Sequence, residues 1–135
     1  MRIKNNLFTQ PTGTRPLEYE WFFAEYEGEQ GVFLVDNGTA YDITKPFVHM
    51  AFNESGFTNI RPVRVTTVLE LGNDYTKVLP SIGEGFTARV NGDFGLFCRI
   101  SSDYVWKINT DEILCRGDFD EICPMSNLEV RINEL

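Results

Sequence analysis

The chain has 135 residues, of which 42% are hydrophobic and 13% aromatic, which excludes a disordered tail because disordered segments lack aromatic and β-branched residues. Its formal net charge of −8 argues against general attachment to DNA, RNA or an anionic membrane, which requires a basic surface. A small basic pocket stays compatible with this charge. The length fits one domain, so we expect a single β-rich domain over residues 1–135.

The cysteines and the first residues indicate a cytoplasmic protein. Cys98, Cys115 and Cys123 are odd in number and form no Cys-x-x-Cys pair, so we expect neither a disulfide framework nor a zinc site. The first six residues are polar and lack the apolar core of a signal peptide. No apolar run approaches the ~20 residues that span a bilayer. We therefore expect reduced thiols and no contact with a membrane.

Alternation of apolar and polar residues predicts several strands between closely spaced turns. Asn37-Gly38 and Asn91-Gly92 suit type I′ hairpin turns, because both residues tolerate a positive φ. Ser101-Ser102-Asp103 separates two later strands. The period of two residues follows from side chains that point alternately to opposite faces of a pleated strand. The predicted strands cover residues 17–23, 32–35, 63–68, 96–100, 104–108 and 128–133.

One helix is predicted between Thr44 and Gly56. Thr44 suits the N-cap, Pro46 the first turn and Gly56 the position after the last turn. Within the segment, apolar residues recur at helical spacing over residues 47–52. A second short helix is predicted to start near Asp111. The fold class is therefore mainly β (α+β), an antiparallel sheet meander with one or two short helices packed on it.

Residue types for catalysis or metal binding are sparse. His49 is the only histidine, and its apolar neighbours favour a structural or surface role over catalysis. Asp118, Asp120 and Glu121 offer oxygens to a hard cation, but the calcium-loop pattern is absent and turn chemistry explains them equally well. Gly83-Glu84-Gly85-Phe86 matches no phosphate-binding fingerprint and favours a tight turn. We expect a protein that is not an enzyme and holds neither metal nor cofactor.

A mixture of arginines and aromatic residues points to ligand binding instead. Guanidinium groups bind phosphate in a planar fork, aromatic rings stack on nucleobases, and the Asn91 amide suits a base edge or a ribose hydroxyl. The same mixture is typical of ordinary sheet surfaces and of protein-interface hot spots, so these alternatives stay open. The candidate ligand-binding residues are Arg61, Arg64, Arg89, Arg116, Phe86, Asn91 and Trp106.

Four segments, residues 3–6, 11–15, 21–28 and 42–47, resemble the first-described phage proteins that counter the Thoeris bacterial immune system. The resemblance covers mainly the N-terminal half and carries no sharp motif. It implies a non-enzymatic sponge that sequesters cyclic ADP-ribose isomers, and in some members cyclic oligonucleotides, in the cytoplasm of the host cell. It also implies a homo-oligomer with pockets at subunit interfaces.

The resemblance further implies arginine for a pyrophosphate and an aromatic ring for a purine. Arg61 and Phe86 are the best positional matches, whereas Asn91 and Arg116 correspond by residue type only.

Two alternatives to the sponge stay open. One is an acidic protein-binding inhibitor of a host defence complex, of the anti-CRISPR or nucleic-acid-mimic type, which would place the glutamates between Glu18 and Glu29 in a basic groove. The other is a structural phage component without a ligand. The inhibitor hypothesis predicts that charge reversal across those glutamates abolishes function. The sponge hypothesis predicts that loss of Arg61 or Phe86 abolishes it.

Overall fold

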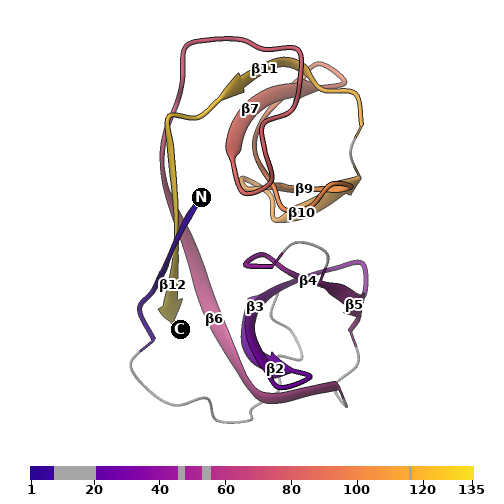
Figure 1. Ribbon diagram of the computed structural model, residues 1–135, viewed down its shortest axis with the longest axis vertical. Helices are drawn as coiled ribbons and strands as arrows, with labels where there is room; N and C mark the ends of the chain where they lie inside the picture. Colours follow the sequence, from indigo (N-terminus) through magenta and orange to yellow (C-terminus); the bar gives the residue numbers. More distant parts are fainter. Residues whose placement is uncertain (8–20, 46–47, 53–55, 116) are drawn as a thin grey trace. The chain divides into compact units, whose positions relative to one another are not determined.

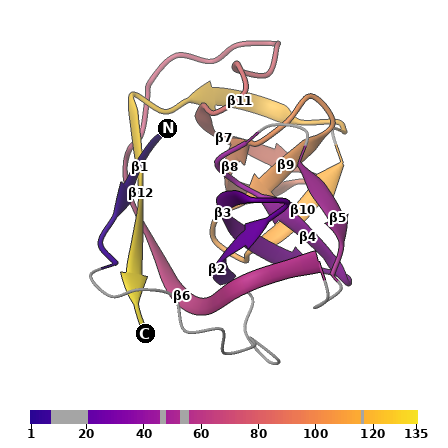
Figure 2. The same cartoon turned by 60° about the horizontal axis from the view of Figure 1, so that its bottom comes forward.

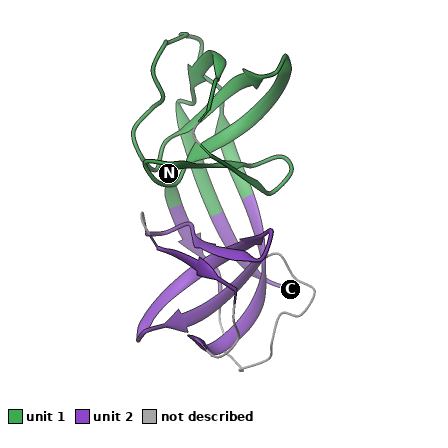
Figure 3. Ribbon diagram, turned by 90° about the vertical axis from the view of Figure 1, so that its right-hand side faces the viewer, with its two compact units in different colours: residues 1–2, 67–130 green, residues 3–66, 131–135 purple. Residues whose placement is uncertain are grey.

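The chain divides into two compact units (Figure 3). The computed structural model describes residues 1–7, 21–45, 48–52, 56–115 and 117–135. Unit 1 comprises residues 1–2 and 67–130, and unit 2 comprises residues 3–66 and 131–135. The change of colour in Figure 3 falls within strands, because β6 (Phe57–Glu70), β12 (Asn127–Glu134) and the short first strand, which begins at Arg2, contribute residues to both units. The single domain stays a prediction.

The described residues form strands and turns in two sheets (Figures 1 and 2), which confirms the mainly β fold class. The seven-stranded sheet has the order β1-β12-β6-β2-β3-β4-β5, and the five-stranded sheet has the order β10-β9-β8-β7-β11. Besides β6 and β12, the strands are β1 (Arg2–Asn5), β2 (Trp21–Tyr26), β3 (Glu29–Asp36), β4 (Thr39–Asp42), β5 (His49–Ala51), β7 (Gly85–Val90), β8 (Asp93–Arg99), β9 (Tyr104–Lys107), β10 (Glu112–Cys115) and β11 (Asp120–Pro124).

The core of unit 2 is built on the hairpin of β2 and β3. Phe22 lies opposite Phe33 in the antiparallel register, and their rings stack at a centroid distance of 5.2 Å. Phe57 meets both rings edge-on, also at 5.2 Å. The next hairpin, β3 to β4, turns through Asn37-Gly38 with positive φ at both residues, which confirms the predicted turn.

The core of unit 1 follows the same plan. Phe86 of β7 lies opposite Phe97 of β8, and their rings stack at 5.4 Å. These strands turn through Asn91-Gly92, again with positive φ at both residues, as predicted. Val105 and Ile122 complete the buried cluster with Ala88.

The helix predicted between Thr44 and Gly56 is wrong for the residues that the structure describes. Residues 49–51 form strand β5, where His49 pairs with Tyr41 of β4. Val48, Met50 and Phe52 pack against the core of unit 2 while His49 and Ala51 are exposed. The apolar positions therefore follow a period of two, which a short apolar run does not distinguish from a helical stripe. Residues 46–47 and 53–55 lie outside the described residues.

The second predicted helix is also wrong. Residues 112–115 form β10, which pairs with β9. Asp111 has a φ of 57° and ends a turn instead of capping a helix. Its carboxylate accepts a hydrogen bond from Trp106 Nε1 at 3.1 Å, so the aspartate satisfies a buried indole. Among the residues that the structure describes, no helix has the length and apolar character needed to cross a bilayer.

Candidate functional site

Phe86 and Trp106 lie in the interior of unit 1. The Phe86 side chain is fully buried and Trp106 is 1% exposed. Phe86 contacts Phe97 on one side and meets the Phe119 ring edge-on at 5.5 Å. Both predicted rings therefore serve the core in this structure, and the aromatic side chain nearest the surface of the cluster is the half-buried Phe119.

The arginines of β6 differ in their surroundings. Arg61 is buried and its guanidinium forms an ion pair with Glu134 of β12. Arg64 is exposed. Both belong to unit 2, whereas Phe86 and Trp106 belong to unit 1. Arg116 lies outside the described residues.

Arg89 and Asn91 come together at the hairpin of β7 and β8. Arg89 Nε donates to Glu121 Oε2 at 2.8 Å, and Arg89 Nη1 donates to the Gly92 carbonyl at 2.9 Å. Asn91 has a φ of 52° and is exposed, so its position is explained by the turn. Of the predicted ligand-binding residues, Arg89 is thus positioned by its bond to β11.

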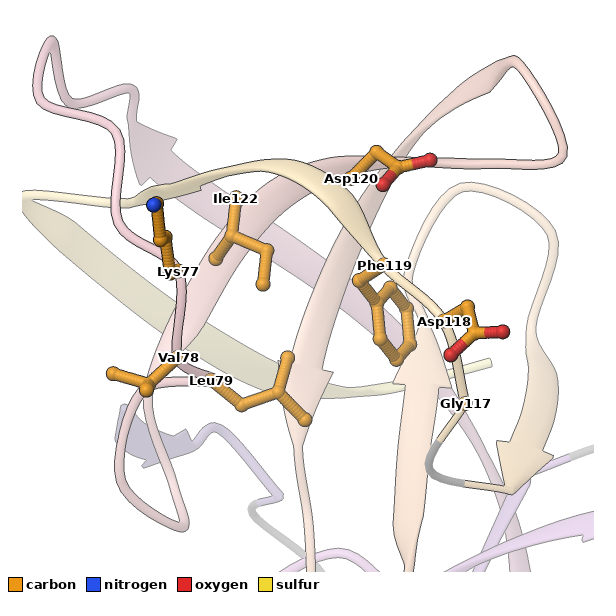
Figure 4. A pocket seen from close by; sticks show the side chains of 8 residues that line it. All are labelled: Lys77, Val78, Leu79, Gly117, Asp118, Phe119, Asp120 and Ile122. Carbon is orange, nitrogen blue, oxygen red and sulfur yellow. The ribbon is translucent and has the colours of Figure 1, made fainter.

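A cavity of about 520 Å³ lies beside β11 in unit 1 (Figure 4). In Figure 4 the side chains of Leu79, Phe119 and Ile122 face one another, while Lys77 lies at one side and Asp118 at the other. The cavity therefore has an apolar floor with charged groups around it. Its lining consists of Lys77, Val78, Leu79, Gly117, Asp118, Phe119, Asp120 and Ile122.

Two local features place these residues. The segment 71–84 between β6 and β7 is fastened to β11, because Thr76 N donates to the Ile122 carbonyl at 2.8 Å. In β11 the pairing with β7 shifts between Asp120 and Cys123, and Glu121 has a φ of 54°. Such bulges redirect the neighbouring side chains and are frequent next to binding sites. The Arg89–Glu121 bond joins this bulge to β7.

The charged side chains of the cavity can both donate and accept hydrogen bonds. The Lys77 ammonium offers three hydrogen-bond donors, whereas the carboxylates of Asp118 and Asp120 only accept. Glu121, considered above as an oxygen ligand for a cation, pairs with Arg89 instead. Among the described residues, no group of three His, Cys, Asp or Glu side chains is arranged to hold a metal ion.

Sequence reasoning missed Lys77, Leu79 and Phe119. One signal was available, since a long connection without regular structure inside a compact chain is usually functional, and segment 71–84 is such a connection. It also carries several exposed apolar side chains, namely Leu71, Tyr75, Val78 and Ile82.

Comparison of the chain with models of known protein families, with curated proteins and with solved structures finds no significant match. The resemblance to the Thoeris anti-defence proteins therefore stays a prediction.

Proposed function

We propose that this protein is a non-enzymatic sponge that captures a small nucleotide-type signal in the cavity beside β11 and withholds it from its receptor. The observation that carries the proposal is the apolar floor of Leu79, Phe119 and Ile122 between an ammonium and two carboxylates. Ligand pockets are typically about 300–1,000 Å³, largely apolar and equipped with a few polar groups. The cavity of about 520 Å³ falls within this volume range, and its lining is more polar than that of a typical ligand pocket.

Each part of a nucleotide has a matching group in the cavity. The Phe119 ring and Leu79 suit a base, whose stacking contributes ~1–3 kcal/mol. Lys77 suits a phosphate as a point charge. Asp118 and Asp120 suit ribose hydroxyls, which donate to carboxylates in dinucleotide-binding proteins. Cyclic ADP-ribose isomers combine these parts, and cyclic oligonucleotides are the next class that we propose.

The test is a thermal-shift series with cyclic ADP-ribose isomers and cyclic oligonucleotides. A ligand at 100 times its Kd should stabilise the fold by about 2.7 kcal/mol, which corresponds to roughly 10 °C for a chain of this size. Chromatography of the ligand recovered after heat denaturation then separates holding from hydrolysis. Intact ligand supports the sponge, and a hydrolysed product refutes it.

A charge-reversal pair tests the location. Lys77→Glu should remove the shift, because it places a third carboxylate at the cavity. Lys4→Glu is the matched control, since Lys4 is exposed on β1 and outside this cavity. An unchanged shift in Lys77→Glu, or no shift with any ligand in the wild-type chain, would refute the proposal.

A second candidate is the acidic protein-binding inhibitor, favoured by the exposed carboxylates of the β2–β3 hairpin. Glu27 and Glu29 flank the turn at Gly28, and the Glu29 side chain is 77% exposed. Glu18 and Glu20 lie outside the described residues. The double variant Glu27→Lys, Glu29→Lys should abolish inhibition of a partner if this function holds, and should leave nucleotide capture in unit 1 unchanged.

A further inference from the structure

A second cavity, of about 190 Å³, lies in unit 2 at the C-terminal ends of β2 and β4. It is well below the size that takes a nucleotide and has room for one small group. Two apolar side chains, Tyr26 and Val48, share its lining with charged ones. The charged residues are Glu27, Glu29, Asp42 and Lys45.

Asp42 has one carboxylate oxygen without a hydrogen bond. Its side chain is 1% exposed. Oδ1 accepts hydrogen bonds from Thr44 N at 2.8 Å and Thr44 Oγ1 at 2.6 Å. Within the described part of the chain, the buried Oδ2 accepts none. Buried polar atoms are almost always hydrogen-bonded, so this oxygen is open to a further hydrogen-bond donor.

Lys45 does not satisfy that oxygen. Its Nζ donates to the Gln30 carbonyl at 2.6 Å and lies 3.5 Å from Glu29 Oε2. The distance from Nζ to Asp42 Oδ2 is 3.9 Å, which is too long for a hydrogen bond. The cavity thus sets three carboxylates against one ammonium.

Gly31, which has no side chain, leaves space for this carboxylate on the neighbouring strand. A Cβ added to Gly31 of β3 would lie 2.5 Å from Asp42 Oδ2, so a side chain at position 31 would displace the carboxylate. Burial raises the pKa of Asp42, although the bonds from Thr44 and the charge of Lys45 act in the opposite direction. A bound cation would offset that cost by stabilising the ionised form.

The acceptor set selects the class of ligand. The carboxylate oxygens of Asp42, Glu27 and Glu29 suit a compact cation with several N–H donors. Among the described residues, no group of three side chains is arranged to hold a metal ion. Tyr26 and Val48 suit an aliphatic stem behind the charged head. We infer that this cavity binds a primary alkylammonium group, with Asp42 Oδ2 accepting one of its N–H bonds and Glu27 and Glu29 adding to the attraction.

The test is a titration of the full chain that is monitored by two-dimensional ¹H–¹⁵N NMR. The probes are n-butylammonium chloride and Nα-acetyl-lysine-methylamide, with n-butanol as the uncharged control. We expect saturable shifts confined to amides of residues 26–31 and 42–45 with both ammonium probes or with n-butylammonium alone. Shifts with both ammonium probes assign the site to a lysine side chain of a partner, and shifts with n-butylammonium alone assign it to free amines. Each of these results supports the inference. Equal shifts with n-butanol, or no saturable shift with either ammonium probe, would overturn it.

Isosteric variants locate the charge. Asp42→Asn should raise the Kd for n-butylammonium at least about tenfold, the equivalent of one charge-assisted hydrogen bond. Asp93→Asn, at an exposed position of β8 in unit 1, should leave the Kd unchanged. Glu29→Gln, at the exposed side, should raise the Kd about twofold to threefold, and it keeps the test valid if Asp42→Asn does not fold. An unchanged Kd in Asp42→Asn with a native spectrum would overturn the inference. Nucleotide capture is measured in unit 1 and fails or succeeds separately.

Discussion

Replacing Phe86 with alanine separates a core role of this ring from a ligand-binding role. The side chain is fully buried, stacked on Phe97 at 5.4 Å and edge-on to Phe119 at 5.5 Å. Phe→Ala in a core costs about 3–5 kcal/mol, and each aromatic pair adds about 0.5–1.5 kcal/mol beyond area burial. Because Phe86 loses two such pairs, we expect a cost of about 4–5 kcal/mol.

The assay is urea denaturation followed by intrinsic fluorescence. With a slope of about 2 kcal/mol per molar urea, the unfolding midpoint should fall by roughly 2 M. Phe94→Ala is the matched control, because Phe94 of β8 is 53% exposed, and it should cost less than about 0.5 kcal/mol. A Phe86→Ala protein with a nearly unchanged midpoint and no ligand binding would refute the core assignment and restore the ring as a base-stacking face.

Three further predictions concern charge and thiols. Arg61→Ala should lower the free energy of unfolding by about 2 kcal/mol, since it removes a buried charge-assisted hydrogen bond. Arg64→Ala, at an exposed site, should change it by less than about 0.5 kcal/mol. Equal effects of the two substitutions in urea denaturation would contradict this prediction. Burial raises the folded-state pKa of Asp42 above its ordinary value of 3.8, so this group lowers the free energy of unfolding of the wild-type chain as the pH rises above that value. The free energy of unfolding of Asp42→Asn relative to wild type should therefore increase between pH 3 and pH 7, and a difference that does not change with pH would contradict this. In the native protein a thiol reagent should modify the exposed Cys115 alone, since Cys98 is buried with a pKa raised by burial to about 12, and the remaining thiols should react only after denaturation.

The strands and hairpin turns could be predicted from the sequence because their signals are local. Asn37-Gly38 and Asn91-Gly92 accept positive φ at little cost, and they form the predicted turns. The helix over residues 44–56 was a wrong prediction because the choice between two periods depends on a partner strand, β4, that pairs with β5.

The candidate sites depend on contacts between distant residues, which residue type does not reveal. Phe86 has the chemistry of a base-stacking ring, but its burial follows from Phe97 and Phe119. Asp42 is buried because Gly31 leaves room for it on the neighbouring strand. Sequence spacing does not show either relation, since each depends on strand register and packing.

The two-part composition of unit 2 has a consequence for synthesis on the ribosome. Residues 131–135 belong to unit 2, where the backbone N–H of Asn6 donates to the Ile132 carbonyl at 2.8 Å and Glu134 forms an ion pair with Arg61. The nascent chain therefore releases the whole stretch 71–126 before β6 acquires β12 as its neighbour in the sheet. Until then β6 presents an open edge, which is the kind of edge that pairs with other chains. Slow translation between β6 and β12 should thus favour aggregation of this protein more than slow translation of the residues that precede β6.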